Sequence, residues 1–128
     1  MELEKQVCSL EQAKRLNELG VVQESHCHWV SSSTMLPEGY HLTVQGVSPF
    51  KDTSRFADSA SAFTVAELGV MLGKESDSCY FNGDGWFYLY DFECIRHETE
   101  AQARAAYLIH LLETGQLTVE EVNRRLTA

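Results

Sequence analysis

The feature that most constrains this chain is a helix-start signal that occurs four times. Each time, a Ser or Thr is followed three residues later by Glu or Gln, so that the two side chains can bond each other's backbone N–H groups in the first turn of a helix. The four pairs are Ser9/Gln12, Thr64/Glu67, Thr99/Gln102 and Thr118/Glu121. A glycine ends the first three of the segments that follow, as is common at helix C-termini. The pattern predicts helices over residues 10–19, 65–72, 100–114 and 119–126, of which the third is the longest.

Between these segments the apolar residues alternate with period two, which is typical of strands. Residues 86–95 show this most clearly and are predicted as one strand with an aromatic face. The turn-forming residues 82–85 (Asn-Gly-Asp-Gly) precede it, so residues 79–81 are its predicted hairpin partner. Two further strands are predicted at 26–30 and 40–44, and residues 46–62 are predicted to be a long loop. The element order predicts a single α+β domain over residues 1–128, in which helices cover an antiparallel sheet of about four strands and a long helix lies near the C-terminus.

Composition limits the class of protein. The chain has 128 residues, of which 44% are hydrophobic, so it can bury a core without disulfides or metal. Its net charge of −9 argues against simple binding to a phosphate backbone, and its longest apolar run, Trp86–Tyr90, is far too short to cross a bilayer. The start of the chain lacks the pattern of a signal peptide, so we expect a cytoplasmic protein. The four cysteines are widely spaced and are expected to be free thiols: Cys8, Cys27, Cys79 and Cys94.

Three segments of the chain, taken together, resemble a known group. They are Cys8-Ser9-Leu10-Glu11-Gln12-Ala13-Lys14-Arg15-Leu16, then Ala62-Phe63-Thr64-Val65-Ala66-Glu67-Leu68-Gly69, and then residues 98–112 with their Glu-Thr-Glu-Ala-x-Ala-Arg-Ala opening. In this order they are similar to small uncharacterised proteins carried by bacterial prophages and related mobile elements. The resemblance implies a phage or prophage origin, and it supplies no activity, cofactor or catalytic residue.

Two histidines and two more distant residues form a candidate metal site. His26 and His28 share one face of a predicted strand, and two imidazoles at that spacing can bind one Zn²⁺. Cys94 and His97 complete four ligands if the two strands lie close together. The alternative is that both histidines are polar surface residues, with Cys27 and Trp29 facing the core. A small metal-binding protein or Cys/His enzyme therefore stays an alternative function.

No complete catalytic or cofactor motif is present, so we expect no cofactor and favour a non-enzymatic role. A calcium-binding loop that includes residues 82–85 would begin at Tyr80 and end at Asp91, where such loops need Asp and a bidentate Glu, so a hairpin turn is predicted instead. Residues 63–69 are typical of the first helix of a helix-turn-helix, but the residues that follow are acidic and lead into a strand. A DNA-binding regulator is therefore a second alternative.

Acidic residues concentrate around the aromatic hairpin. Residues 75–100 contain seven acidic residues and one arginine, a local balance of −6. Aromatic side chains within an acidic rim suit a basic protein partner or mimicry of nucleic acid. The predicted interaction surface consists of Asp84, Trp86, Tyr88, Tyr90, Asp91 and Glu93. The alternative is a solvated sheet edge whose aromatic face belongs to the core.

These observations together predict an accessory protein that acts through protein–protein contacts. Its partner is an unknown protein or a second copy of the chain, rather than nucleic acid or a membrane.

Overall fold

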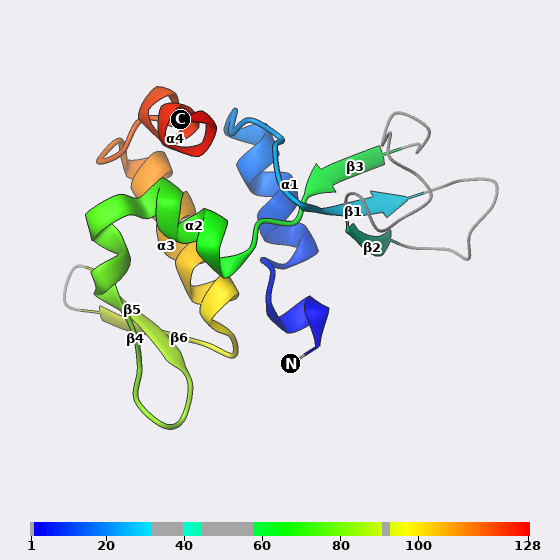
Figure 1. Cartoon of the computed structure of the whole chain (residues 1–128). Coiled ribbons are helices and arrows are strands. Elements are labelled where there is room, and N and C mark those ends of the chain that lie inside the picture. The colour runs from blue at the N-terminus through cyan, green and yellow to red at the C-terminus, as the bar shows by residue number, and fades with distance from the viewer. Residues whose placement is uncertain (1, 32–39, 45–57, 91–92) are drawn as a thin grey trace.

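The computed structural model describes residues 2–31, 40–44, 58–90 and 93–128 and shows an α+β fold (Figure 1). Its elements in chain order are η1 (Leu3–Lys5), α1 (Leu10–Glu18), β1 (Cys27–Ser31), β2 (Tyr40–Val44), β3 (Asp58–Ser61), α2 (Val65–Leu72), η3 (Gly73–Ser78), β4 (Cys79–Phe81), β5 (Trp86–Tyr90), β6 (Glu93–His97), α3 (Glu100–Thr114) and α4 (Val119–Thr127). The predicted fold class and the long helix near the C-terminus are confirmed.

All four helices begin at the predicted residues. Ser9, Thr64, Thr99 and Thr118 each accept a hydrogen bond from the backbone N–H three residues later. The bounds of α2 and α3 are those predicted, while α1 ends one residue earlier and α4 one residue later. The reciprocal bond of a capping box forms at α1 and α2. At α4 the carboxylate of Glu121 instead binds two arginines of its own helix.

The strands form two three-stranded antiparallel sheets rather than one sheet of about four strands. The strand orders are β2-β1-β3 and β4-β5-β6. The single strand predicted over 86–95 is wrong, because the chain reverses between Tyr90 and Glu93, which pair with each other. An alternating pattern continues unchanged across a two-residue connection, so it does not reveal the reversal. The end of the predicted loop at 46–62 is also a strand, β3, which pairs with β1; residues 45–57 lie outside the described part of the chain.

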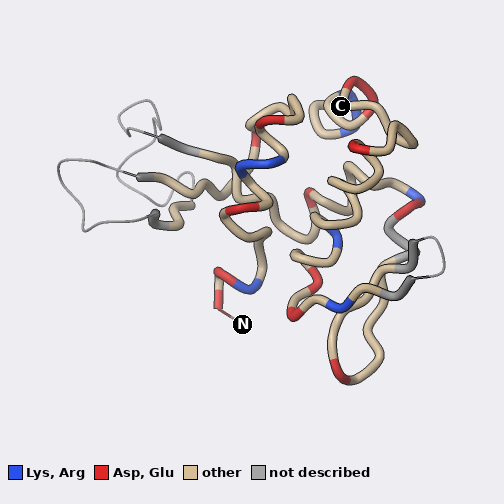
Figure 2. The backbone as a smooth tube through the Cα atoms, turned by 180° about the vertical axis from the view of Figure 1, so that it is seen from behind, with Lys and Arg blue, Asp and Glu red and all other residues tan. Residues whose placement is uncertain are grey.

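The helices lie between the two sheets and form the main core. In Figure 1 the sheet β2-β1-β3 lies to one side of the helices and the sheet β4-β5-β6 to the other, and Figure 2 shows the same separation from behind. The largest fully buried side chains come from α1, α2, α3 and the residues just before α2: Phe63, Leu16, Leu68, Met71, Leu72 and Leu108. A smaller cluster of Val7, Cys27 and Ala62 lies under the first sheet. The molecule thus carries two separate sheets on one helical core.

The junction between α2 and the first sheet depends on the carboxylate of Glu67. One oxygen, Oε1, accepts from the Thr64 N–H at 2.9 Å and from the Ser25 hydroxyl at 2.7 Å, and Oε2 accepts from the His26 N–H at 3.1 Å. The Ser25 hydroxyl in turn accepts from the Cys27 N–H at 3.1 Å. A side chain in the first turn of α2 therefore fixes where β1 begins.

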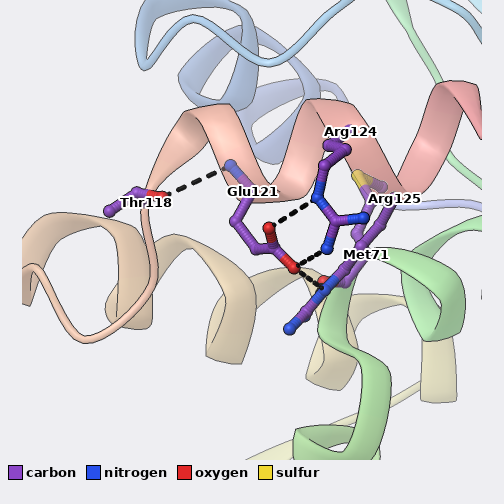
Figure 3. Close-up of polar contacts among 5 residues, drawn as sticks. All are labelled: Met71, Thr118, Glu121, Arg124 and Arg125. Carbon is purple, nitrogen blue, oxygen red and sulfur yellow. Dashed lines mark hydrogen bonds and ion pairs between the residues drawn. The ribbon is translucent and has the colours of Figure 1, made fainter.

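The other end of α2 is held by α4 (Figure 3). Arg125 donates from Nη1 to the Met71 carbonyl at 2.9 Å, and its Nε donates to Glu121 at 3.1 Å. The Met71 carbonyl is in the last turn of α2, where helix carbonyls lack partners within the helix. Arg124 binds the same Glu121 but points to solvent and makes no bond to α2 in Figure 3. Arg125 thus caps α2 from a neighbouring helix.

Arg125→Ala should lower the free energy of unfolding by about 1–2 kcal/mol, because the partly buried Met71 carbonyl loses a charged donor. Arg124→Ala is the matched control. It removes an exposed ion pair to the same glutamate and should leave stability near the wild-type value. Urea unfolding followed by circular dichroism measures both. Equal losses in the two variants would contradict the proposed capping role.

Glu67→Ala should lower the free energy of unfolding by about 2–3 kcal/mol, more than Arg125→Ala, because it removes a helix cap and two hydrogen bonds to the residues at the start of β1. Glu120→Ala, at an exposed first-turn position of α4, is the control and should change little. The same urea titrations serve. A Glu67→Ala protein as stable as Glu120→Ala would show that the junction does not depend on this carboxylate.

Candidate functional site

The sheet β4-β5-β6 has one face against helix α3. Directly opposed residues of an antiparallel sheet point to the same side, and Tyr88 lies between Cys79 and Ile95. The Tyr88 ring packs on Tyr107 of α3 with ring centroids 5.3 Å apart, and Tyr88 is only 6% exposed. This row of side chains is therefore the helix-facing side of the sheet.

The opposite face carries Tyr80, Phe87 and Arg96 in one row. The rings of Tyr80 and Phe87 are stacked, with centroids 5.9 Å apart and planes at 20°. Arg96 reaches back to the hairpin turn, where Nη2 donates to the Asp84 carbonyl at 3.0 Å and Nε lies 3.7 Å from the Asp84 carboxylate. The positive charge on this face is thus already paired, and the stacked rings are its apolar part.

Exposed apolar side chains concentrate on this sheet. In the described part of the chain the exposed large hydrophobic residues are Val70 (51%), Tyr80 (42%), Phe81 (56%) and Ile95 (37%). All except Val70 belong to β4 or β6. Phe81 also packs against Trp86, with ring centroids 5.3 Å apart. We call Tyr80, Phe81, Phe87 and Ile95 the hairpin surface; it includes residues from both faces of the sheet.

The structure distributes the predicted interaction residues over different surroundings. Asp84 is exposed on the hairpin turn, which forms as predicted, with its N–H bonded to Asn82 Oδ1 at 3.1 Å. Trp86 is half-buried. Tyr88 departs from the predicted surface, because it is buried against α3 and belongs to the core. Tyr90 and Glu93 pair in register at the ends of β5 and β6.

The remaining predicted residue, Asp91, lies outside the described part of the chain. The residues of the hairpin surface were not predicted, because their exposure depends on which part of the sheet α3 packs against. The only signal for them was the aromatic content of residues 79–81 and 86–90.

A groove lies where the N-terminal segment meets the starts of α2 and α3. One hollow of about 340 Å³ is lined by residues that include Lys5, Val65, Ala66, Trp86, Glu98 and Glu100. A second hollow of about 610 Å³ is lined by Glu2, Glu4, Lys5, Glu98, Thr99 and Gln102. The two share Lys5, Glu98 and Thr99, so they adjoin. We call them together the Trp86 groove.

Backbone hydrogen bonds hold the N-terminal wall of this groove. The Cys8 N–H donates to the Phe63 carbonyl at 2.9 Å, and the Val65 N–H donates to the Gln6 carbonyl at 3.3 Å. Val7 and Thr64 form the isolated antiparallel bridge between these bonds. The segment before α1 is thereby fixed against the first turn of α2.

The candidate metal ligands do not converge. His26 precedes β1 and His28 lies in it, whereas Cys94 and His97 lie in β6 of the other sheet, across the helices (Figure 1). His97 is stacked on Tyr88, with ring centroids 5.5 Å apart. Among the side chains that the structure describes, no group of three or more His, Cys, Asp or Glu is arranged to hold a metal.

Burial disfavours the charged forms of three cysteines and of His28 and His97. Burial raises the pKa of Cys8 to about 12 and that of Cys79 to about 11, and it also raises the pKa of Cys27. Because the thiolate is the nucleophile, these three cysteines are unsuited to nucleophilic catalysis. Burial lowers the pKa of His28 and of His97.

The helix-turn-helix hypothesis concerned residues 63–69, which include the start of α2. That helix is followed by the short 3₁₀ helix η3 and then by strand β4, whereas a helix-turn-helix has a recognition α-helix at this place.

Stability should fall as the pH drops below about 6.5, the ordinary pKa of histidine. The unfolded chain then binds protons that the folded chain takes up only at lower pH, because burial lowers the pKa of His97. His97→Phe keeps a ring on Tyr88 and removes the titration, so its stability loss between pH 7.5 and 5 should be smaller. His26→Gln, at an exposed position, is the control. Urea titrations across this range measure the difference, and identical pH profiles for wild type and His97→Phe would contradict it.

Comparison with known protein families, curated proteins and solved structures finds no match for this chain. No helix in the described part of the chain is long and apolar enough to cross a membrane.

Proposed function

We propose that this protein is a non-enzymatic accessory protein that binds a positively charged protein partner through the hairpin surface. The observation that carries the proposal is the concentration of exposed Tyr80, Phe81 and Ile95 on one small sheet. Phe81 and Ile95 lie on one face of this sheet and Tyr80 on the other. Exposed apolar side chains that gather on one part of a molecule mark interaction sites, and aromatic residues are enriched at the centres of protein interfaces.

The charge around the sheet indicates the sign of the partner. Residues 75–100 carry a balance of −6 within a chain of net charge −9. Asp84 is exposed at the hairpin turn, and Arg96, the arginine of this segment, is engaged by it. A basic partner would be attracted over a distance and then held by apolar contacts, whereas an acidic partner would be repelled.

Two further parts of the proposal come from elsewhere in the chain. The phage or prophage origin is supported by the resemblance of the segments at 8–16, 62–69 and 98–112 to prophage proteins. A cytoplasmic location is supported by Cys8, Cys27 and Cys79, which are free, since reduced thiols are typical of reducing compartments.

The test is binding to an array of twelve-residue peptides that vary in charge and aromatic content. Wild-type protein should select peptides that combine Arg or Lys with apolar residues, and added salt should weaken the binding of these peptides. Tyr80→Ala/Phe81→Ala should weaken the selected peptides by about tenfold or more, as truncation of interface anchors does. Isothermal titration calorimetry on the best peptides gives the affinities.

Val70→Ala is the matched control, because Val70 is an equally exposed apolar residue on α2, outside the sheet. It should bind like wild type. Urea unfolding of each variant confirms that it is folded. An array without preference for cationic peptides, or equal affinity in the double variant and Val70→Ala, would overturn the proposal.

A further inference from the structure

We infer that the Trp86 groove is the docking site for an arginine side chain of the basic partner. This inference rests on the proposed function and adds to it a second contact point and the kind of residue that the partner presents there.

The groove combines an aromatic wall with a small apolar floor. The half-buried indole of Trp86 lines the first hollow together with Val65 and Ala66 of α2. The same indole packs against Phe81, the most exposed aromatic residue of the hairpin surface. One partner segment can therefore contact the hairpin surface and reach into the groove.

The charges at the groove favour a cation. One ammonium group, that of Lys5, lines the two hollows. Four carboxylates line them as well, those of Glu2, Glu4, Glu98 and Glu100. Figure 2 shows acidic positions both on the N-terminal segment and where β6 leads into α3. Glu100 is paired with Arg104 at 2.7 Å. Glu98 is exposed and lines both hollows, so it is the carboxylate best placed to meet a ligand.

Two helices begin at the groove, and a helix N-terminus on its own favours an anion. Here part of each first turn is already engaged. The Val65 N–H bonds to the Gln6 carbonyl, and the Glu67 N–H bonds to the Thr64 hydroxyl. At α3 the Gln102 N–H bonds to the Thr99 hydroxyl. With these donors in use and carboxylates around them, the groove suits a cation better than an anion.

Arginine fits this arrangement better than lysine. Its planar guanidinium stacks on an indole face and can bind a carboxylate through two parallel hydrogen bonds. Lysine offers a compact, strongly hydrated charge that makes neither contact as well. The groove provides the indole from Trp86 and the carboxylate from Glu98.

The experiment uses the full chain, ¹⁵N-labelled, with blocked tetra-arginine as the probe at low salt. The chain has two tryptophans, so its NMR spectrum contains two indole N–H signals, which Trp86→Phe assigns. Trp29 is the internal reference, because its indole donates to the Cys8 carbonyl at 3.1 Å, away from the groove lining. Tetra-arginine should shift the Trp86 signal to saturation and leave the Trp29 signal in place. Tetralysine should bind several-fold more weakly, and tetraglutamate should produce no shift.

Glu98→Gln should weaken tetra-arginine about three- to tenfold, while Glu120→Gln, which removes the same charge from an exposed position on α4, should not. A saturable Trp86 shift with tetraglutamate would overturn the inference in favour of an anion site. Equal affinities of Glu98→Gln and Glu120→Gln would overturn it in favour of non-specific attraction. An unmoved Trp86 signal would overturn it outright.

Failure of this inference is distinguishable from failure of the proposed function. Tyr80 lies on the face of the sheet opposite Trp86, so Tyr80→Ala tests the hairpin surface without altering the groove lining. If array peptides lose affinity in Tyr80→Ala but keep it in Glu98→Gln, the groove inference is wrong and the proposed function stands. If the array shows no cationic preference while tetra-arginine still shifts Trp86, the proposed function is wrong.

Discussion

The Glu67 carboxylate joins helix α2 to the sheet β2-β1-β3. It caps α2 and also fixes the residues from which β1 begins, so the first sheet takes its position from a helix of the central core. The same short helix is tied at its other end to α4 through Arg125. Along its side Gly69 faces the Arg104 guanidinium of α3, and a Cβ there would lie 2.5 Å from Nη1. Helix α2 therefore sets where the surrounding elements lie.

The helices could be predicted from the sequence because their signals are local. A Ser or Thr at the cap and its partner three residues later act within one turn, whatever the rest of the chain does. The strands were predictable only in part. The predictions at 40–44 and 79–81 match β2 and β4, but the reversal after Tyr90 and strand β3 depend on contacts that no local pattern records. The alternation across Tyr90 and Glu93 is the same for one strand as for a hairpin. β3, with the sequence Asp-Ser-Ala-Ser, lacks the β-branched and aromatic residues that indicate a strand, and forms because β1 offers it an edge.

The sequence indicated the segment that contains the candidate site but not the residues that form it. The local excess of acidic residues and the aromatic content both indicated residues 75–100. Which aromatic side chains reach solvent is decided by the packing of α3 on the sheet, which buries Tyr88 and leaves Tyr80 exposed. Of the Trp86 groove the sequence indicated only Trp86, because the other walls come from residues 2–6, 64–66 and 98–102, which meet only in the folded chain.

The way in which the N-terminal segment is attached would link the proposed ligand binding at the Trp86 groove to folding. Residues 2–6 form one wall of the groove, and the Gln6–Val65 backbone bond holds that wall against the first turn of α2. A ligand that fills the groove would contact both the N-terminal segment and the first turn of α2. It would therefore favour the state in which the two are held together and would stabilise the folded protein. Conversely, an extension fused ahead of Met1 that pulls on this segment would lower affinity without changing any residue that contacts the ligand.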